Sequence, residues 1–492
     1  MNDSRPQTPI PSPKSLGPGP YFVPVIAAIL YLTPLLLDAP LTDPDEGRHA
    51  VISQEMIERG DFVVPRLFGS PFLDKPILFF WAQAASLRLF GMSTAAARLP
   101  GMLFALLGIV TTGWLARVLL ANDTGPATPR IGAMAAGCYA TMMLPFLLAQ
   151  APVHDIALVP FTNLALGFLW RAARHSEFDR QQAPSALSLG GIRDSLLAGV
   201  ALGLATLTKG LEGIAIVGIG FTVYLLATRT LTRRLVLLGI VVIAVAVLVA
   251  LPWYMAMNAR VPGYLGYYFL NRHVLGFVTE TQRHGGQAWW YYVPLLVAGG
   301  LPWIVYVRGG AMSDAPGKLL WIWLAASLVL LSLSNSKAVT YILPVMPAIA
   351  VLGSRSEKMQ RHWRPVVIAT ATVCLTAILA AGPALARGHS SIDLTDYFND
   401  EGQVPNHLFV MESRIAFAYY LRPDVRARMH RDQIESFTLD DLSAIRPFPK
   451  DAVLALPADL AERRLARLPE LANGYRKEVG RYLLIAPAPF SD

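Results

Sequence analysis

Charged residues and cysteines are both scarce in this sequence. Of its 492 residues only 15% are charged, whereas 54% are hydrophobic, and the mean hydropathy is +0.43. Soluble domains carry about a quarter charged residues, so this composition excludes a purely soluble enzyme, a disordered chain and a fibrous protein. The two cysteines, Cys138 and Cys374, are too few for a disulfide framework or a four-cysteine zinc site. Both lie in apolar runs, and we expect them to pack in the interior.

Long apolar runs, by contrast, are abundant. A transmembrane helix needs about 20 apolar residues, and eleven segments approach this length. They lie near 21–38, 99–120, 131–150, 156–173, 194–208, 211–228, 235–257, 289–307, 317–333, 338–353 and 365–386. The stretch 76–91 is either interfacial or a further span. We therefore expect an all-α polytopic membrane protein with about 11–13 transmembrane helices.

The net charge of +8 is distributed between the apolar segments, which indicates membrane orientation and not nucleic-acid binding. Basic residues gather in the short segments of one side, most clearly in RSEKMQRHWR at 355–364. The positive-inside rule makes this side cytoplasmic. With an odd number of spans, the C-terminal residues then lie outside the cytoplasm.

Composition divides the chain into three parts. Residues 1–20, rich in Pro, Ser and Gly, are expected to form a disordered cytoplasmic tail. Residues 21–386 form the transmembrane domain, whose outer loop 39–98 is far too long for a hairpin. Residues 387–492 have ordinary soluble composition and predict a small extracytoplasmic α/β domain. Its expected strands are HLFVM, AVLALP and YLLIAP, and its expected helices are ESRIAFAYYLR and DLAERRLARLPEL.

The first outer loop opens with TDPDEGRHAVISQEMIERGDF, which reads as a helix start. Asp43 would be the N-cap, Pro44 the first helical residue and Glu46 the capping partner. A helix start accounts for Asp43, Pro44 and Glu46, but it gives no reason for Asp45 or Arg48 to be present. The helix dipole keeps a carboxylate at this position ionised, which suits a group that orients an acceptor or receives its proton. Asp43-Pro44-Asp45 also matches the D-x-D motif that binds a metal in soluble sugar-nucleotide enzymes. No Gly-rich phosphate loop or βαβ unit accompanies it, so we set this interpretation aside.

Two further outer segments carry ionisable residues at the membrane edge. Lys75 lies just before Pro76 in PFLDKPILFFW, and its alternative role is a snorkelling lysine at the membrane surface. Asp155 stands beside His154 in AQAPVHDIAL, where a span begins. Asp155 either caps that helix or is functional, because an ionisable group next to a span is a functional candidate.

Two lysines occupy outer turns, where the positive-inside rule disfavours them. Lys209 lies in LATLTKGLEG, and its alternative role is an ion pair with Glu212 three residues on. Lys337 lies in SNSKAVTYILP. Cations at the headgroup level suit a lipid phosphate, and the aspartates Asp45 and Asp155 suit acid–base or orienting work on a hydroxyl.

An ordered set of short strings runs through most of residues 40–350. They are DPDEGRHAVISQEM, LDKPILFFW, the turn His154–Asp155, LTKG at 207–210, NRHVLGF at 271–277, WWYYVP at 289–294 and SKAVTYILPVMPAIA at 336–350. In this order they resemble the bacterial GT-C type glycosyltransferases that use lipid-linked sugars. The resemblance is strongest to the branch containing 4-amino-4-deoxy-L-arabinose lipid A transferase, within the protein O-mannosyltransferase-like superfamily. The C-terminal domain is matched only loosely.

This resemblance implies a GT-C fold, glycosyltransferase activity and a role for each matching residue. The implied roles are catalysis for Asp45 and Asp155, donor-phosphate binding for Arg48, Lys75, Lys209 and Tyr341, accessory roles for Glu46, His154 and Lys337, and metal binding for Asp74 and His273. His49 stands where a tyrosine is usual, and Gly276 where an arginine is expected. These departures leave the sugar and the acceptor open.

The implied reaction moves a sugar from a polyprenyl-phosphate donor to lipid A or another envelope glycan, at the periplasmic side of the bacterial inner membrane. Its partners are the lipid-linked donor, a lipid or glycan acceptor and membrane lipids, with no nucleic acid. No cofactor is required, and a divalent metal remains an alternative. Competing hypotheses are a protein O-mannosyltransferase-like enzyme and a lipid or sugar transporter or flippase. Transporters usually contain internal repeats, and none is clear in this sequence.

Overall fold

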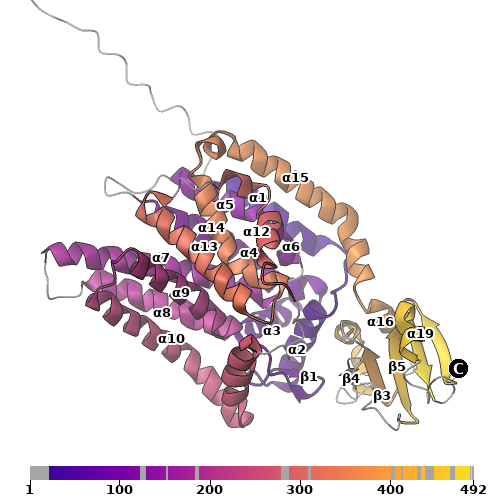
Figure 1. Ribbon diagram of the computed structural model, residues 1–492. Coiled ribbons are helices and arrows are strands. Elements are labelled where there is room, and N and C mark those ends of the chain that lie inside the picture. The colour runs from indigo at the N-terminus through magenta and orange to yellow at the C-terminus, as the bar shows by residue number, and fades with distance from the viewer. Residues whose placement is uncertain are drawn as a thin grey trace, which may run out of the picture.

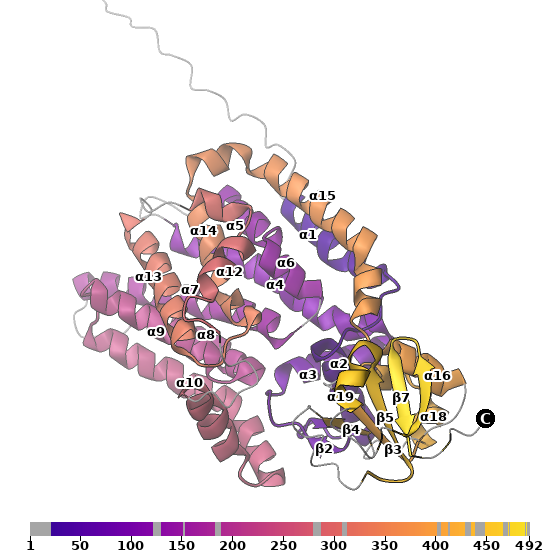
Figure 2. The ribbon, with the colours of Figure 1, turned by 45° about the vertical axis from the view of Figure 1, so that its right-hand side comes forward.

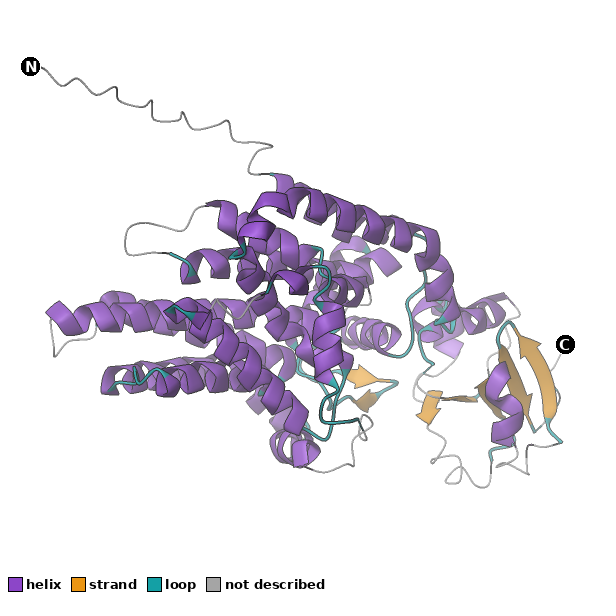
Figure 3. Ribbon diagram, turned by 45° about the horizontal axis from the view of Figure 1, so that its top comes forward, coloured by secondary structure: helices purple, strands orange, loops and turns teal. Residues whose placement is uncertain are grey.

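The computed structural model describes residues 21–121, 129–150, 153–182, 188–278, 287–307, 312–400, 405–411, 414–428, 434–437, 448–465, 471, 473–487 and 489. The expected disordered tail 1–20 lies outside these residues. A helical body makes up most of the structure, and a small sheet lies at one end of it (Figures 1 and 3). The predicted fold class, a helical membrane protein with a small C-terminal α/β part, is confirmed.

The body consists of helices, most of them joined by short connections, with a longer segment between α2 and α3. In chain order they are α1 (Phe22–Leu32), α2 (Asp45–Arg59), α3 (Leu78–Phe90), α4 (Thr94–Leu119), α5 (Pro129–Ala140), α6 (Met143–Gln150), α7 (His154–Gln182), α8 (Leu189–Lys209), α9 (Glu212–Ala227), α10 (Arg233–Arg260), α11 (Gly276–Val278), α12 (Tyr292–Gly299), α13 (Ala315–Leu333), α14 (Met346–Ser354) and α15 (Glu357–Gly388). A π-helical segment, Gly266–Leu275, precedes α11, and a 3-10 segment, Val339–Val345, precedes α14.

Every predicted apolar segment overlaps with helix, although 289–307 is helical only in part, and fewer helices than expected are long enough to cross a bilayer alone. Within the described ranges, six meet both length and apolarity: α4, α7, α8, α10, α13 and α15. The pair α5 and α6 meets these criteria only when taken together, and it is bent by 57°, as in a broken span or a re-entrant loop. Helix α9, with 16 residues, extends only about 24 Å, less than the hydrocarbon core of a bilayer. The interfacial alternative for 76–91 corresponds to the 13-residue helix α3.

Helices α8 and α10 approach each other closely because glycines line one face of α8. A Cβ atom on Gly199 would lie 2.6 Å from Cβ of Val245, and one on Gly203 would lie 2.6 Å from Cβ of Val249. Small residues four positions apart let membrane helices pack backbone against side chain. This packing fixes the end of α8, where Lys209 lies.

We expect Gly203→Val to destabilise the helical body by about 1–3 kcal/mol, because the added side chain overpacks the α8–α10 contact. Thermal unfolding in detergent micelles measures this change. The matched control is Gly218→Ala on α9, where an added Cβ meets no heavy atom within 4 Å. A Gly203→Val protein with the unfolding temperature of the wild type would show that the two helices separate freely.

The C-terminal part contains a five-stranded mixed sheet in the order β4-β3-β5-β7-β6. Its elements are α16 (Ile392–Asp400), β3 (His407–Met411), α17 (Phe417–Tyr420), α18 (Pro423–Arg428), β4 (Ile434–Phe437), β5 (Ala452–Pro457), α19 (Ala458–Leu465), β6 (Tyr475–Val479) and β7 (Tyr482–Ala486). Strand β3 is parallel to β4 and β5, and β7 is antiparallel to β5 and β6.

The three predicted strands of this part are confirmed as β3, β5 and β7, whereas the helix expected over ESRIAFAYYLR is reduced to the single turn α17. Strands β4 and β6 were not expected. The exposed strand β6 carries the polar sequence YRKEV, which lacks the apolar character that marks a strand.

The C-terminal part packs on the first outer loop, so the two lie on the same side of the helical body (Figure 2). Asp43 accepts hydrogen bonds from the backbone N–H groups of Ser391 (2.8 Å), Ile415 (2.7 Å) and Ala416 (2.8 Å). The N-cap role predicted for Asp43 is therefore wrong: Pro44 occupies the cap position of α2, and no side chain caps it. The carboxylate instead satisfies backbone donors of a segment more than 300 residues away, which the local sequence cannot reveal.

Candidate active site

The candidate site begins at the abrupt end of α8. Gly210, with φ +69°, stops the helix directly after Lys209, and α9 begins two residues later at Glu212. A side chain at Gly210 would be strained by this φ and would also lie 2.7 Å from the Tyr268 hydroxyl. The glycine thus lets the chain reverse beneath the π-helical segment and directs Lys209 inward.

Lys209 is a buried cation held by two carboxylates, and only 5% of the residue is exposed. Its ammonium group forms an ion pair with Asp155, in the first turn of α7, and a second one, at 2.7 Å, with Glu212. The ammonium also lies 3.9 Å from the centre of the Tyr341 ring, a cation–π contact. The predicted Lys209–Glu212 pair is confirmed, and Asp155 joins it from another helix.

Lys209, Glu212 and Tyr341 border a cavity of about 430 Å³, whereas Asp155 is not among the residues that line it. Its polar walls are formed by Asp74, Lys75, Lys209, Glu212, Arg272, His273, Ser334, Ser336 and Tyr341. Its apolar walls include Leu211, Ala215, Val274, Phe277, Leu330 and Leu331. A cavity that combines several cations with extensive apolar surface fits an anion attached to a hydrocarbon chain.

A second cluster lies on the N-terminal turns of α2. Asp45 forms an ion pair with Arg48, whose guanidinium stacks at 5.8 Å on the Phe72 ring. The Asp45 side chain is 51% exposed. Burial raises the pKa of this carboxyl, but His49, Arg48 and Lys75 outweigh that effect and hold the pKa below its ordinary value. Asp45 is therefore a carboxylate at neutral pH.

Lys75 connects the two clusters. Its ammonium acts electrostatically on Asp45 and also on Lys209, Asp155 and Glu212. Burial and the repulsion from Lys209 lower the pKa of Lys75. The structure thus brings together residues of the first outer loop, of α7 and of the α8–α9 turn, which lie far apart in the sequence.

The three residues predicted to have accessory roles, Glu46, His154 and Lys337, make other contacts and do not line the cavity. Glu46 is buried against Arg98, with Oε1 2.5 Å from its Nε, and also accepts the Thr42 N–H at 2.8 Å. His154 is buried among aromatic rings, 4.8 Å from Phe79. Lys337 donates to the Ser334 carbonyl oxygen at 2.5 Å.

Asp74 and His273 both line the cavity, but they do not complete a metal site. Asp74 accepts from the Tyr267 hydroxyl at 3.2 Å and lies 3.6 Å from Arg272. Burial, followed by repulsion from Arg272, lowers the pKa of His273 to about 4, so its ring is neutral. A structural zinc ion takes four ligands. In the part of the chain that the structure describes, no group of three or more His, Cys, Asp or Glu is placed to hold a metal.

Sequence reasoning did not assign Glu212 and Arg272 to the site. Glu212 had a visible signal, since it is an acid at the start of a span beside a lysine that is itself unusual there. Arg272 had a weaker one, as the neighbour of His273 in NRHVLGF. The place of Arg272 on the cavity wall depends on the π-helical segment Gly266–Leu275, which the local pattern does not predict, whereas Glu212 begins α9.

The fold has close counterparts among solved structures. ArnT from Cupriavidus metallidurans in the apo state matches with a TM-score of 0.72 at 23% identity, over 95% of this chain and 97% of that one. The archaeal oligosaccharyltransferase AglB from Archaeoglobus fulgidus matches with a TM-score of 0.57 at 14% identity, over 95% of this chain and 74% of that one. The helical body and its cavity therefore define a membrane protein of the GT-C fold.

Sequence comparison is more specific. Residues 74–253 match the family model described as dolichyl-phosphate-mannose-protein mannosyltransferase. The chain is 32% identical, over 339 residues, to the undecaprenyl phosphate-alpha-4-amino-4-deoxy-L-arabinose arabinosyl transferase of Pectobacterium carotovorum. It is also 32% identical, over 340 residues, to the second such transferase of Pseudomonas fluorescens. The predicted resemblance to this branch is confirmed.

The matched region is a larger share of this chain than of either relative. It includes 67% of this chain in both cases, but 57% of the Pectobacterium protein and 54% of the Pseudomonas protein. The chain thus spans less than two thirds of the length of these relatives.

Proposed function

We propose that this protein is an integral membrane glycosyltransferase that transfers a sugar from a polyprenyl-phosphate donor to lipid A or another envelope glycan. The observation that carries the proposal is the buried Lys209 cluster at the wall of a cavity with apolar sides. The relatives named above are transferases of an undecaprenyl-phosphate-linked sugar, and one solved ArnT structure holds undecaprenyl phosphate. Both support a lipid-linked donor.

In the proposed reaction the donor phosphate approaches Lys209, Lys75 and Arg272, and the polyprenyl chain lies against the apolar wall. The bond between the sugar anomeric carbon and the phosphate oxygen breaks, and its electron pair stays on the phosphate. Preorganised cations stabilise that growing negative charge, which is usually the largest contribution to catalysis. The Tyr341 ring stabilises the Lys209 ammonium through its cation–π contact.

Asp45 has the stronger case as the group that receives the acceptor proton. The acceptor oxygen forms the new bond to the anomeric carbon, and its proton passes to a carboxylate. Asp155 is already paired with buried Lys209, whereas Asp45 is half exposed and kept ionised. Asp155 then acts as a positioning residue for Lys209.

The proposed site faces the periplasm of a bacterial inner membrane, and the C-terminal residues 387–492 form a domain on that same side. The support is the basic segment 355–364, which the positive-inside rule assigns to the cytoplasm, and the packing of the C-terminal part on the first outer loop.

Mass spectrometry of envelope lipids and glycans from cells with and without the protein tests the function. We expect one sugar-modified species to disappear when the protein is absent. Loss of a modified protein instead of a modified lipid would favour the O-mannosyltransferase alternative, which the family model over residues 74–253 supports. Unchanged lipids, glycans and proteins would contradict the proposal.

Lysine and arginine side chains supply the charge that the leaving phosphate needs, so we expect sugar transfer to persist in excess EDTA within about twofold. The assay is transfer of radiolabelled sugar by the purified protein in proteoliposomes. A loss of transfer that Zn²⁺ or Mn²⁺ restores in the wild type, but not in His273→Ala, would instead assign a metal to Asp74 and His273.

A further inference from the structure

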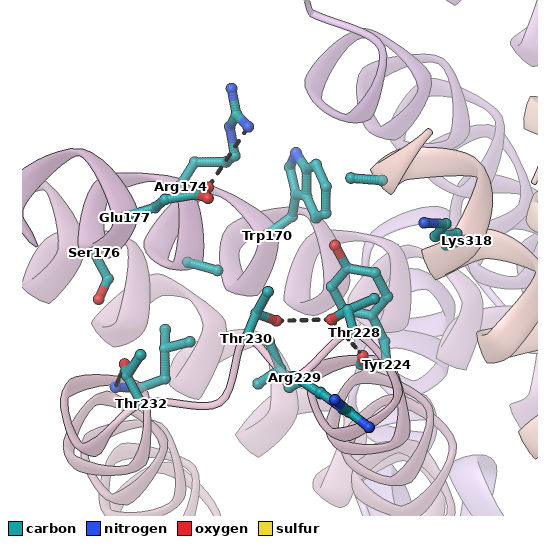
Figure 4. A pocket seen from close by; sticks show the side chains of 14 residues that line it. Trp170, Arg174, Ser176, Glu177, Tyr224, Thr228, Arg229, Thr230, Thr232 and Lys318 are labelled. Atoms are coloured by element: carbon teal, nitrogen blue, oxygen red, sulfur yellow. Dashed lines mark hydrogen bonds and ion pairs between the residues drawn. The ribbon is translucent and has the colours of Figure 1, made fainter. Parts of the chain in front are cut away.

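A second cavity, of about 310 Å³, lies at the other end of α9 (Figure 4). Ends of α7, α9 and α13 meet there with the turn that leads into α10. Its polar lining residues are Arg174, Ser176, Glu177, Thr228, Arg229, Thr230, Thr232 and Lys318, beside the aromatic residues Trp170 and Tyr224. The 16-residue helix α9 separates this cavity from Glu212 by about 24 Å, so the cavity does not belong to the candidate active site.

The walls of this cavity carry an excess of positive charge. Among the described residues that line it, Arg174, Arg229 and Lys318 are basic and Glu177 alone is acidic. Arg174 and Glu177 are 3.7 Å apart and both about half exposed, so this ion pair contributes little to stability. Figure 4 shows Arg174 on α7 and Lys318 on α13 on different sides of Trp170 and Tyr224. An anion entering between them would be attracted from more than one wall.

Hydroxyl groups gather on the turn that closes the cavity. Thr228 donates to the Tyr224 carbonyl oxygen at 2.8 Å, and its hydroxyl lies 2.8 Å from that of Thr230. Between them Arg229 adopts φ +56°, a conformation that L residues rarely take. The tight turn thereby places one guanidinium and two hydroxyls on the same short segment, a combination suited to phosphate oxygens.

An apolar groove of about 630 Å³ adjoins this polar cavity. Leu225 and Leu235 line both of them, so the two spaces meet at these residues. From Leu225 the groove continues along α9 to Ile214, eleven positions away, which corresponds to about 16 Å. The combined space is cationic at one end and apolar along the helices. An anionic phospholipid matches this arrangement, because its headgroup is negatively charged and its acyl chains are apolar.

We propose that this combined space binds one anionic phospholipid from the membrane leaflet opposite the candidate active site. The headgroup phosphate lies between Arg174, Lys318 and the Thr228–Thr230 turn, and one acyl chain follows the groove between α9 and α10. The bound lipid connects α9 with α13. Because the far ends of these helices contribute Glu212 and Leu331 to the first cavity, the lipid also braces that cavity.

Native mass spectrometry of the full-length protein in detergent, with added phosphatidylglycerol or phosphatidylcholine, tests the headgroup end. We expect the wild type to retain phosphatidylglycerol preferentially. We expect Arg174→Gln combined with Lys318→Gln to weaken that binding about tenfold, because two charge-assisted contacts are lost. The matched control is Arg361→Gln, which removes an exposed basic residue away from the cavity. Equal retention of the two lipids by the wild type would overturn the proposal.

The groove end needs a separate variant. An added Cβ on Gly239 meets no heavy atom within 4 Å, although this residue lines the groove. Gly239→Leu therefore fills the groove while the charged end stays intact. We expect this variant to lose phosphatidylglycerol about as strongly as the charge variant, with unchanged binding of inorganic phosphate. Undiminished phosphatidylglycerol binding by Gly239→Leu, or wild-type binding of inorganic phosphate as tight as that of the lipid, would identify a site for soluble anions and refute the proposal.

Discussion

Replacing Lys209 by alanine is expected to reduce sugar transfer by about 10²–10³-fold, the usual effect of removing one preorganised group that stabilises transition-state charge. It also leaves Asp155 and Glu212 as neighbouring buried carboxylates without their shared cation. Breaking a buried ion pair by removing one partner costs about 3–5 kcal/mol of stability. Transfer of radiolabelled sugar in proteoliposomes and thermal unfolding in detergent measure the two effects.

A second variant separates catalysis from folding. Adding Glu212→Gln to Lys209→Ala removes one of the two unpaired charges and should restore part of the lost stability, while transfer stays low. The control for loss of a lysine is Lys358→Ala, at an exposed position on α15. Full recovery of transfer in the double variant would show that Lys209 acts only through stability.

Asp45→Asn is expected to lower the rate of transfer by about 10²–10⁴-fold, the range for losing a general base or acid, with little effect on stability. Its partner Arg48 pairs with a half-exposed carboxylate, and such pairs contribute about 1 kcal/mol or less. Because the pKa of Asp45 is held below its ordinary value by His49, Arg48 and Lys75, we expect the wild-type rate to stay constant through the pH range in which an ordinary aspartate becomes protonated and to fall only at lower pH.

The matched control for Asp45 is Glu58→Gln, which removes a carboxylate of the same helix that pairs with Arg426 at 2.6 Å. It should keep the wild-type rate. A wild-type rate in Asp45→Asn, together with a large loss in Asp155→Asn, would transfer the proton-accepting role to Asp155. In that case Lys209 must release Asp155 during the reaction.

The candidate aspartates and lysines could be selected from the sequence because their positions contradict ordinary membrane chemistry. A lysine in an outer turn and acids at the starts of spans are costly without a role or a partner, so Lys209, Asp155 and Lys75 stood out from the sequence. The residues that pair with them could not be identified from the sequence, except for Glu212, which lies three residues after Lys209. The pairing of Lys209 with Asp155 joins residues 54 positions apart.

Asp43 shows where local reasoning failed, whereas Glu46 keeps part of its expected local role by accepting the Thr42 backbone N–H at the helix start. Both have the residue types of a helix start, but Asp43 binds the C-terminal part and Glu46 binds Arg98 on α4. The side-chain oxygens go to the most numerous buried donors within reach, and tertiary packing alone decides which donors those are.

Apolar composition by itself determined that the chain is a helical membrane protein, because hydrocarbon allows no unsatisfied backbone groups and helices satisfy them locally. The basic segments likewise predicted its orientation. Only the tertiary structure decided where each helix begins and ends, how the C-terminal part packs on α2, and that Lys75 and Lys209 line one cavity while Asp155 pairs with Lys209 and Asp45 with Arg48. Such contacts join distant parts of the chain, and their energies depend on burial and distance, which sequence periodicity does not contain.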